Sequence, residues 1–188
     1  MIQVAAAMAL VGQAALLGIG MLWLGGFVCE PARKALLWVR QAFQGIEVWS
    51  AFLVALLATS GSLFFSEYSG FIPCHLCWLQ RYCMYPLVLI LPAAALWPKQ
   101  WLLKAALIVP VAGLGISVWH RYVEANPAAG SQGCRKGGGC AVNWLEGLAP
   151  FDFITIPTLS MTAFALIIVF LLAAIFSPSR SSFPQVSR

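Results

Sequence analysis

The chain has 188 residues, of which 61% are hydrophobic and only 9% are charged. Soluble domains average about 25% charged residues, so this composition excludes an ordinary soluble domain and indicates a membrane protein. The net charge of +5 comes from basic residues scattered over short segments, which excludes the basic stripe with interleaved aromatic residues expected of a nucleic-acid-binding protein.

Five stretches of the chain contain no Asp, Glu, Lys or Arg, and they cover residues 2–28, 48–66, 82–98, 105–120 and 153–179. A hydrocarbon core about 30 Å thick needs roughly 20 apolar residues per helix. The third and fourth stretches are short, but Arg81, Lys104 and Arg121 at their ends carry long side chains that can reach the interface. The sequence therefore predicts an all-α membrane protein with five transmembrane helices.

The first stretch differs from a signal peptide, because its start has no charged side chain and the basic residues follow the apolar run. We expect it to remain as an extra transmembrane helix at 1–28, followed by a basic connector at 29–47. Most Lys and Arg residues lie on the side of this connector and of the tail at 177–188, which the positive-inside rule makes the cytoplasmic side. The loops at 67–77 and 122–153 are therefore predicted to lie outside.

The longest segment between predicted spans covers residues 124–152. Its first half is rich in glycine and contains a proline, so we expect it to be mobile. Its second half, at 141–153, carries aromatic and leucine side chains with few charges, which predicts a segment lying along the membrane surface.

Four of the six cysteines lie in the two loops predicted outside, on the oxidising side of the membrane, namely Cys74, Cys77, Cys134 and Cys140. Cys74 and Cys77 form a Cys-x-x-Cys motif at the start of a predicted helix, where the helix dipole favours a reactive thiolate. Cys134 and Cys140 flank Arg-Lys-Gly-Gly-Gly, a flexible stretch that suits thiol–disulfide exchange. Two cysteine pairs on one face predict a disulfide relay, with all four cysteines as catalytic residues.

Arg81 lies four residues after Cys77, so on a helix its guanidinium and the sulfur share one face near the membrane surface. A quinone that accepts two electrons from a dithiol develops negative charge on its ring oxygens. A fixed cation at Arg81 and a hydrogen-bond donor such as Gln80 would stabilise that charge. The spacing therefore predicts electron transfer to a lipid-soluble quinone that binds beside Arg81 and Gln80.

Two other interpretations of these residues stay open at this point. Both cysteine pairs could be structural disulfides in a non-enzymatic membrane scaffold, with Arg81 only an interfacial anchor. The four cysteines could instead hold zinc in a tetrahedral site. The oxidising compartment and the five residues between Cys134 and Cys140 disfavour zinc, and we predict no metal ligand.

The remaining two cysteines and the two histidines have weaker patterns. Cys29 and Cys83 are predicted to be inert packing residues. His75, between the two reactive cysteines, either tunes their thiols or is only exposed at the membrane surface. His120 is predicted to be an interfacial residue rather than a ligand.

The string Pro-Cys-His-Leu-Cys-Trp-Leu-Gln-Arg-Tyr-Cys-Met-Tyr-Pro, from Pro73 to Pro86, closely resembles the Cys-x-x-Cys-x-x-Gln/Glu-Arg signature of the DsbB/BdbC family of disulfide-bond formation proteins. Phe-Ile-Thr-Ile-Pro-Thr-Leu-Ser, from 153 to 160, is similar to the same family, and the resemblance covers residues 48–176. The close spacing of Cys134 and Cys140 resembles BdbC, whereas the N-terminal helix is an addition. Vitamin-K-epoxide-reductase-like proteins are related, but they lack the Gln-Arg extension.

The resemblance implies a four-helix transmembrane bundle, a bound ubiquinone or menaquinone, and a thioredoxin-fold, DsbA- or BdbD-like disulfide oxidase as the partner. It also implies that Cys134 meets the partner, that Cys140 and Cys74 exchange between the loops, and that Cys77 with Arg81 faces the quinone. We therefore expect a protein-disulfide:quinone oxidoreductase of the cell membrane whose redox loops face the periplasm or the extracytoplasmic side.

Overall fold

The structure is a computed structural model, and it describes residues 2–26, 29–97, 99–126, 129, 140 and 155–176. Cys134 and the segment predicted to follow the membrane surface lie outside these residues. Every regular element in the described part of the chain is helical. The elements are α1 (Ile2–Gly25), α2 (Glu30–Ala42), α3 (Glu47–Leu63), a π-helical turn η1 (Phe64–Tyr68), α4 (His75–Leu96), α5 (Gln100–Ala125) and α7 (Ile156–Ile175).

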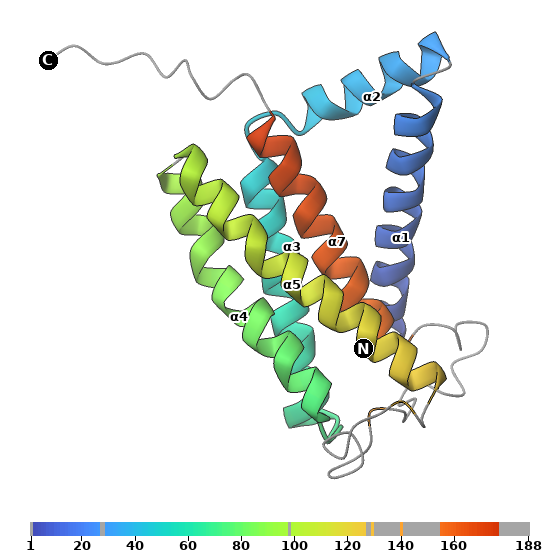
Figure 1. Cartoon of the computed structure of the whole chain (residues 1–188), viewed down its shortest axis with the longest axis vertical. Helices are drawn as coiled ribbons and strands as arrows, with labels where there is room; N and C mark the ends of the chain where they lie inside the picture. The colour runs from blue at the N-terminus through green and yellow to red at the C-terminus, as the bar shows by residue number, and fades with distance from the viewer. Residues whose placement is uncertain are drawn as a thin grey trace, which may run out of the picture.

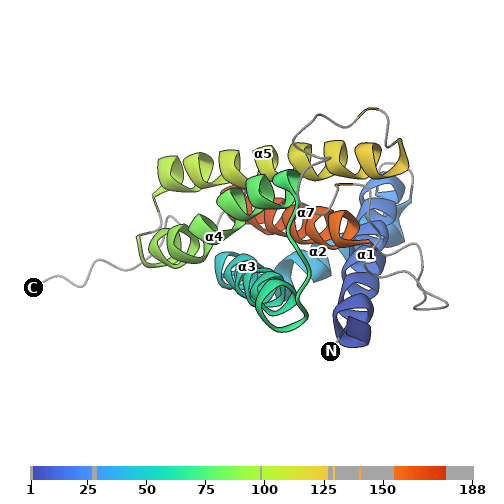
Figure 2. The same cartoon turned by 90° about the horizontal axis from the view of Figure 1, so that it is seen from below.

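Helices α3, α4, α5 and α7 form a closed bundle in which each helix packs against two neighbours, in that order around the ring (Figure 1, Figure 2). The buried residues of its core are aliphatic except for Met84 and Phe164. Within the described residues, four segments are long and apolar enough to cross a membrane, namely α3 with η1, α4, α5 and α7. The predicted four-helix bundle with one additional N-terminal helix is therefore confirmed.

The two short predicted spans extend at their ends, as expected. Helix α4 begins at His75 and helix α5 runs from Gln100 to Ala125, so Arg81, Lys104 and Arg121 all lie within helices. The helices gain length by including long basic side chains whose apolar stems can lie along lipid. As a result the Cys-x-x-Cys motif lies on the first turn of a spanning helix, at the end of the bundle where α5 ends and α7 begins. We call this the cysteine end.

Helices α5 and α7 approach each other closely because a glycine faces a large ring. A Cβ atom added to Gly113 would lie 2.4 Å from the ring of Phe164, which is fully buried. Close contact through small residues is how helices associate in lipid, where no hydrophobic difference drives them together. Gly113 therefore fixes the distance between the two helices that carry His120 and Ser160.

Helix α1 lies outside the four-helix ring and contacts it through α7 (Figure 1). Gly12 packs against Thr162 and Leu166, and Nε2 of Gln13 donates a hydrogen bond of 3.2 Å to Oγ1 of Thr162. The stretch of α1 from Leu10 to Gly25 is apolar but shorter than a full span. Among the described side chains, α1 therefore meets the four-helix ring on α7, and it also packs against α2.

The segment predicted as a basic connector contains a helix that the sequence analysis did not anticipate. Helix α2 crosses the end of the bundle opposite the cysteine end (Figure 1), and none of its residues is buried. Glu30 and Arg33 form an exposed ion pair in its first turn. Cys29 precedes the helix and is exposed, so the prediction that it is a packing residue is wrong. Cys83 is partly buried against the bundle core, as predicted.

Candidate redox site

The candidate site is built on the first turns of α4, where Cys74 is the N-cap residue. The backbone of Cys74 is extended, and its Sγ atom accepts a hydrogen bond of 3.3 Å from the backbone N–H of Cys77. The first N–H groups of a helix lack intrahelical partners and carry partial positive charge. A sulfur in the N-cap position is therefore stabilised as the thiolate, as the Cys-x-x-Cys pattern predicted.

The two sulfurs of the motif face each other. The Sγ atoms of Cys74 and Cys77 are 3.0 Å apart, and neither residue is in a disulfide. Cys74 is buried and Cys77 is partly buried. The pair is a reduced dithiol placed so that a small movement of the sulfurs would close a disulfide.

His120, near the end of α5, completes this cluster. It is 3% exposed, and its Nε2 atom lies 3.6 Å from the Sγ of Cys74. The prediction that His120 is an interfacial residue is wrong, because α5 extends past the predicted span and its last turns cover the start of α4. His75 is exposed and borders a separate surface hollow with Trp78, Leu79 and Tyr82. Among the described residues, the histidine that contacts a cysteine sulfur is His120.

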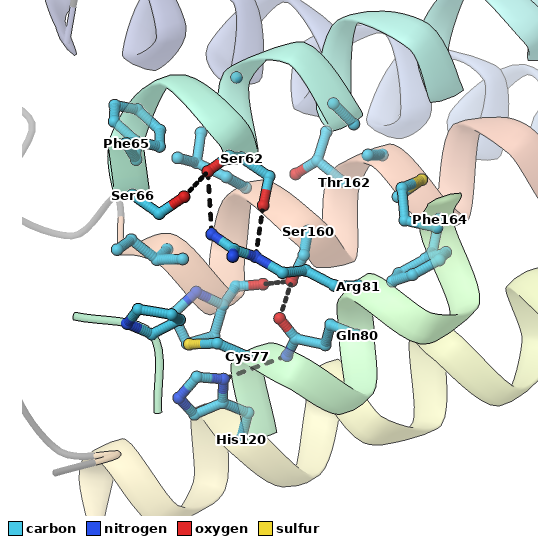
Figure 3. Close-up of a pocket in the computed structure, with 18 of the residues that line it drawn as sticks. Ser62, Phe65, Ser66, Cys77, Gln80, Arg81, His120, Ser160, Thr162 and Phe164 are labelled. Carbon is cyan, nitrogen blue, oxygen red and sulfur yellow. Dashed lines mark hydrogen bonds between the residues drawn. The ribbon is translucent and has the colours of Figure 1, made fainter. Parts of the chain in front are cut away.

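The hydrogen bond from Gln80 determines which ring nitrogen of His120 carries the proton (Figure 3). The Ser160 hydroxyl donates to Oε1 of Gln80 over 3.1 Å, and the amide nitrogen of Gln80 lies 3.1 Å from Nδ1 of His120. The amide N–H therefore donates to Nδ1, and a neutral imidazole then carries its proton on Nε2, directed at the Cys74 sulfur. Ser117 lies 3.1 Å from Ser160 and extends the chain of hydrogen bonds into α5.

These contacts change the acidity of the N-cap cysteine. The hydrogen bond from the Cys77 side chain is the largest cause that lowers the pKa of Cys74, and the hydrogen bond and charge of His120 lower it further. Burial of the sulfur acts in the opposite direction. The result is a pKa of about 4 for Cys74, so in the reduced protein this residue is a thiolate at neutral pH.

Arg81 occupies the next position toward the membrane interior and is held by α3. Its Nε donates to Oγ of Ser62 over 3.0 Å, and its Nη2 donates to the carbonyl oxygen of Ser62 over 2.9 Å (Figure 3). The guanidinium also lies 5.2 Å from the centre of the Trp78 ring, a favourable cation–π distance. The predicted cation therefore has a fixed position, although the serine that holds it was not foreseen.

A cavity of about 270 Å³ opens beside the dithiol between α3, α4 and α7. Apolar side chains form most of its wall, and the polar groups are concentrated at the cysteine end. The predicted site residues Cys74, Cys77, Gln80, Arg81 and Cys140 all line it, together with His120. Trp78 and Tyr82 are absent from the lining. The cavity has the apolar wall and the few convergent polar groups that are typical of ligand sites.

Cys140 brings the second cysteine pair to the same place. It is 3% exposed, disulfide-bonded, and packed in a small cluster with Cys74, Leu76 and Val123. Cys134 lies outside the described residues. A cysteine of the long loop thus reaches the Cys-x-x-Cys motif, as a relay between the two pairs requires.

Three side chains of the site were not predicted as site residues, namely His120, Ser62 and Ser160. Each is a polar residue inside a predicted apolar span, and such residues usually face the interior of a membrane bundle. That rule would have identified them as interior residues. It would not have paired them with Gln80 or Arg81, because the pairings depend on how the helices pack.

Comparison with known proteins identifies the family. The family model described as "Disulfide bond formation protein DsbB" matches residues 45–178. The chain belongs to the DsbB family. The matched region contains α3, α4, α5 and α7 with the complete candidate site, whereas α1 and α2 precede it.

Curated relatives of this DsbB-family chain carry corresponding names. It is 42% identical over 128 residues to "Disulfide bond formation protein C" of Bacillus subtilis, covering 66% of this chain and 88% of the relative. It is 38% identical over 130 residues to "Probable disulfide formation protein" of Deinococcus radiodurans, covering 66% and 85%. No solved structure matches the chain. Together with the four spanning helices, these matches show a multi-pass membrane protein of disulfide-bond formation.

Proposed function

We propose that the protein is a thiol:quinone oxidoreductase that re-oxidises a thioredoxin-fold, DsbA- or BdbD-like oxidase and passes the two electrons to a membrane quinone. The observation that carries the proposal is that the dithiol and Arg81 line one apolar cavity inside the bundle. A cavity with such a wall favours a lipid-soluble acceptor over a water-soluble one. The non-enzymatic scaffold does not explain why the two closely spaced sulfurs border a cavity of this kind.

The residues that line the cavity fit a quinone. Arg81 supplies a positive charge fixed by Ser62, and Cys77 lies one turn before it on the same helix face. A bound quinone accepts two electrons and two protons and leaves as the quinol. The guanidinium would stabilise the negative charge that develops on a ring oxygen, because it is held in place before the charge appears. Ubiquinone and menaquinone both have such an oxygen.

The electrons reach the cavity in two disulfide exchanges. The partner dithiol attacks the disulfide that contains Cys140, so the partner is oxidised and the loop pair is reduced. The reduced loop pair then reduces the disulfide of Cys74 and Cys77 and is itself re-oxidised. In this second exchange Cys140 attacks Cys74, against which it packs, and displaces Cys77. Cys134 then attacks Cys140 and displaces Cys74, which is a good leaving thiolate because a thiol of low pKa leaves faster. The sum is one partner disulfide and one quinol for each quinone.

The proposal includes a location. The positive-inside rule places α2 on the cytoplasmic side and the cysteine end on the extracytoplasmic or periplasmic side of the cell membrane. A thioredoxin-fold oxidase on that side would reach the loop that contains Cys140 without crossing the bilayer.

The test uses the purified protein with a reduced thioredoxin-like oxidase and a soluble quinone, and it measures loss of quinone absorbance. Catalytic quinol formation that disappears in Cys77→Ser and persists in Cys83→Ser is the expected result. Both residues lie on α4, but Cys83 packs against the bundle core. If neither ubiquinone nor menaquinone analogues gave turnover, the result would support the non-enzymatic scaffold instead.

A further inference from the structure

The sulfurs of Cys74 and Cys77 and a ring nitrogen of His120 lie within 4.8 Å of one another. We propose that the reduced form of the protein binds a zinc ion through these three side chains. The four-cysteine zinc site considered from the sequence does not correspond to this arrangement, because Cys140 is disulfide-bonded and the third ligand is a histidine. Binding of the ion does not depend on the proposed quinone chemistry, although its effect on turnover does.

The spacing of the three ligand atoms is close to what zinc requires. Zinc–sulfur bonds of about 2.3 Å in a tetrahedron place two sulfurs about 3.8 Å apart, compared with 3.0 Å between Cys74 and Cys77. The sulfurs would therefore separate by less than about 1 Å. The 3.6 Å from the Cys74 sulfur to Nε2 of His120 already suits a shared ion. All three ligand residues line the cavity of about 270 Å³, which has room for a water molecule as the fourth ligand.

Charge favours zinc over harder cations. Two thiolates and one divalent ion sum to zero, and a neutral complex is tolerated far better in an apolar, buried site than a bare dication or dithiolate. Thiolate and imidazole ligands select zinc and other soft ions, whereas calcium and magnesium need oxygen ligands. Binding is written as a proton exchange: the zinc ion adds to both sulfurs, and any thiol proton still present is released.

Gln80 and Ser160 can support the metal-bound form of His120. A histidine that ligates through Nε2 carries its proton on Nδ1, and that proton needs an acceptor. Rotation of the Gln80 amide would turn Oε1 toward Nδ1 and the amide nitrogen toward Ser160. The Ser160 hydroxyl could accept from that nitrogen while it donates to the Pro157 carbonyl oxygen, 2.9 Å away. Gln80 keeps both of its hydrogen bonds in the exchange, and the contact between Nε2 of His120 and the Cys74 sulfur is replaced by coordination of both atoms to the ion.

The site depends on the redox state. A disulfide between Cys74 and Cys77 has no thiolate to offer, so the oxidised protein lacks two of the three ligands. The ion would also occupy the part of the cavity beside Cys77. If the proposed function holds, zinc would keep the dithiol from passing its electrons on, and a chelator would restore turnover.

The test is an anaerobic titration of the purified protein with Co²⁺, followed by displacement with Zn²⁺. Tetrahedral thiolate–imidazole cobalt absorbs visible light, so binding is seen without any activity measurement. A variant with Cys134→Ser and Cys140→Ser serves as the background, because reduction would otherwise release the loop thiols as well. The absorption is expected in the reduced background variant and not after oxidation of Cys74 and Cys77.

The two histidines provide a matched pair of variants in that background. His120→Ala should weaken zinc affinity more than about tenfold, since loss of even an outer-shell partner costs 10- to 100-fold. His75→Ala, beside Cys74 in sequence but exposed, should leave it unchanged. Equal affinity in both variants, or no tetrahedral cobalt spectrum in the reduced protein, would overturn the proposal. The proposed function is tested independently, by measuring quinol formation in the parent protein without added metal.

Discussion

The Nε2 atom of His120 lies 3.6 Å from the Sγ atom of Cys74, although the two residues are 46 positions apart in the chain. The contact exists because α5 extends to Ala125 and lays its last turns over the start of α4. It places the reactive sulfur between a helix N-terminus and an imidazole. Both features stabilise the thiolate, so the contribution of each neighbouring group to the acidity of Cys74 can be tested with a separate variant.

Alkylation of Cys74 in the reduced protein should follow a thiolate titration with a midpoint near pH 4. Because the pKa is lowered, the rate should be constant at neutral pH and fall only as the pH drops through that value. Cys77→Ala should raise the midpoint most, and His120→Ala should raise it less, since the Cys77 hydrogen bond is the larger cause. The measurement is the iodoacetamide rate at Cys74 by mass spectrometry. His75→Ala is the control, and a midpoint unmoved by His120→Ala would contradict the assigned contact.

Replacement of Arg81 should weaken quinone binding without preventing insertion of the protein. Hydrogen bonds to charged groups contribute about 1.5–3 kcal/mol, and each 1.4 kcal/mol is a tenfold change. Arg81→Met should therefore raise the half-saturating quinone concentration by about 10- to 100-fold. Arg81→Lys should recover only part, because an ammonium lacks the planar donors that bind Ser62. Quinone-dependent re-oxidation of the reduced protein measures the effect. Unchanged half-saturation in Arg81→Met would leave Arg81 as an interfacial anchor.

The two cysteine pairs should be separable by the choice of reductant. Cys140→Ser should abolish oxidation of the protein partner, yet a small dithiol that reduces the Cys74–Cys77 disulfide directly should still drive quinol formation. Cys77→Ser should lose quinol formation with both reductants. Stopped-flow quinone absorbance with each reductant distinguishes the two variants. Partner oxidation at the parent rate in Cys140→Ser would disprove the relay.

Gly113 should be the position in α5 that is least tolerant of a methyl group. Gly113→Ala would place its Cβ 2.4 Å from the buried Phe164 ring, and overpacking of this kind lowers the free energy of unfolding by about 1–3 kcal/mol. Gly115→Ala meets no atom within 4 Å and should be neutral or slightly stabilising. Unfolding in detergent micelles compares the two. Equal stability of the variants would show that α5 and α7 do not depend on this contact.

Thiol labelling from each side of the membrane should separate the two ends of the bundle. In single-cysteine variants, a membrane-impermeant reagent should reach Cys29 only from the cytoplasmic side and Cys134 only from the opposite side. Cys29 is exposed beside α2 and should react readily. Labelling of Cys134 from the cytoplasm would reverse the proposed topology.

Local patterns in the sequence predicted part of this site, and tertiary packing determined the rest. Cys74, Cys77 and Arg81 lie within eight positions of one helix start, so helix geometry alone brings them together. His120 comes from another helix, and no local pattern states which residue it will face. Its position instead favoured an interfacial role, because the predicted span ended at His120 and the charged Arg121 follows.

Helix α2 was missed for a different reason, although its pattern is present in the sequence. Ala32, Ala35, Leu36 and Val39 recur at helical spacing and are its less exposed residues. They form no uncharged stretch, because Arg33 and Lys34 lie among them and Arg40 follows directly. In a helix that is apolar on one side only, charged residues of the other side interrupt the sequence, so no uncharged run marks the helix.

The hydrogen-bond chain through Ser117, Ser160, Gln80 and His120 has a consequence for how the protein assembles. It joins α5, α7 and α4, and in lipid such polar contacts select one helix order and one axial register among several that aliphatic packing allows. The residues that determine which nitrogen of His120 carries the proton thus also specify how the three inserted helices pack against one another. A Gln80 variant should therefore be impaired both in the redox reaction at Cys74 and in the correct packing of its helices. The effect on the redox reaction can be measured only in the correctly assembled fraction of the protein.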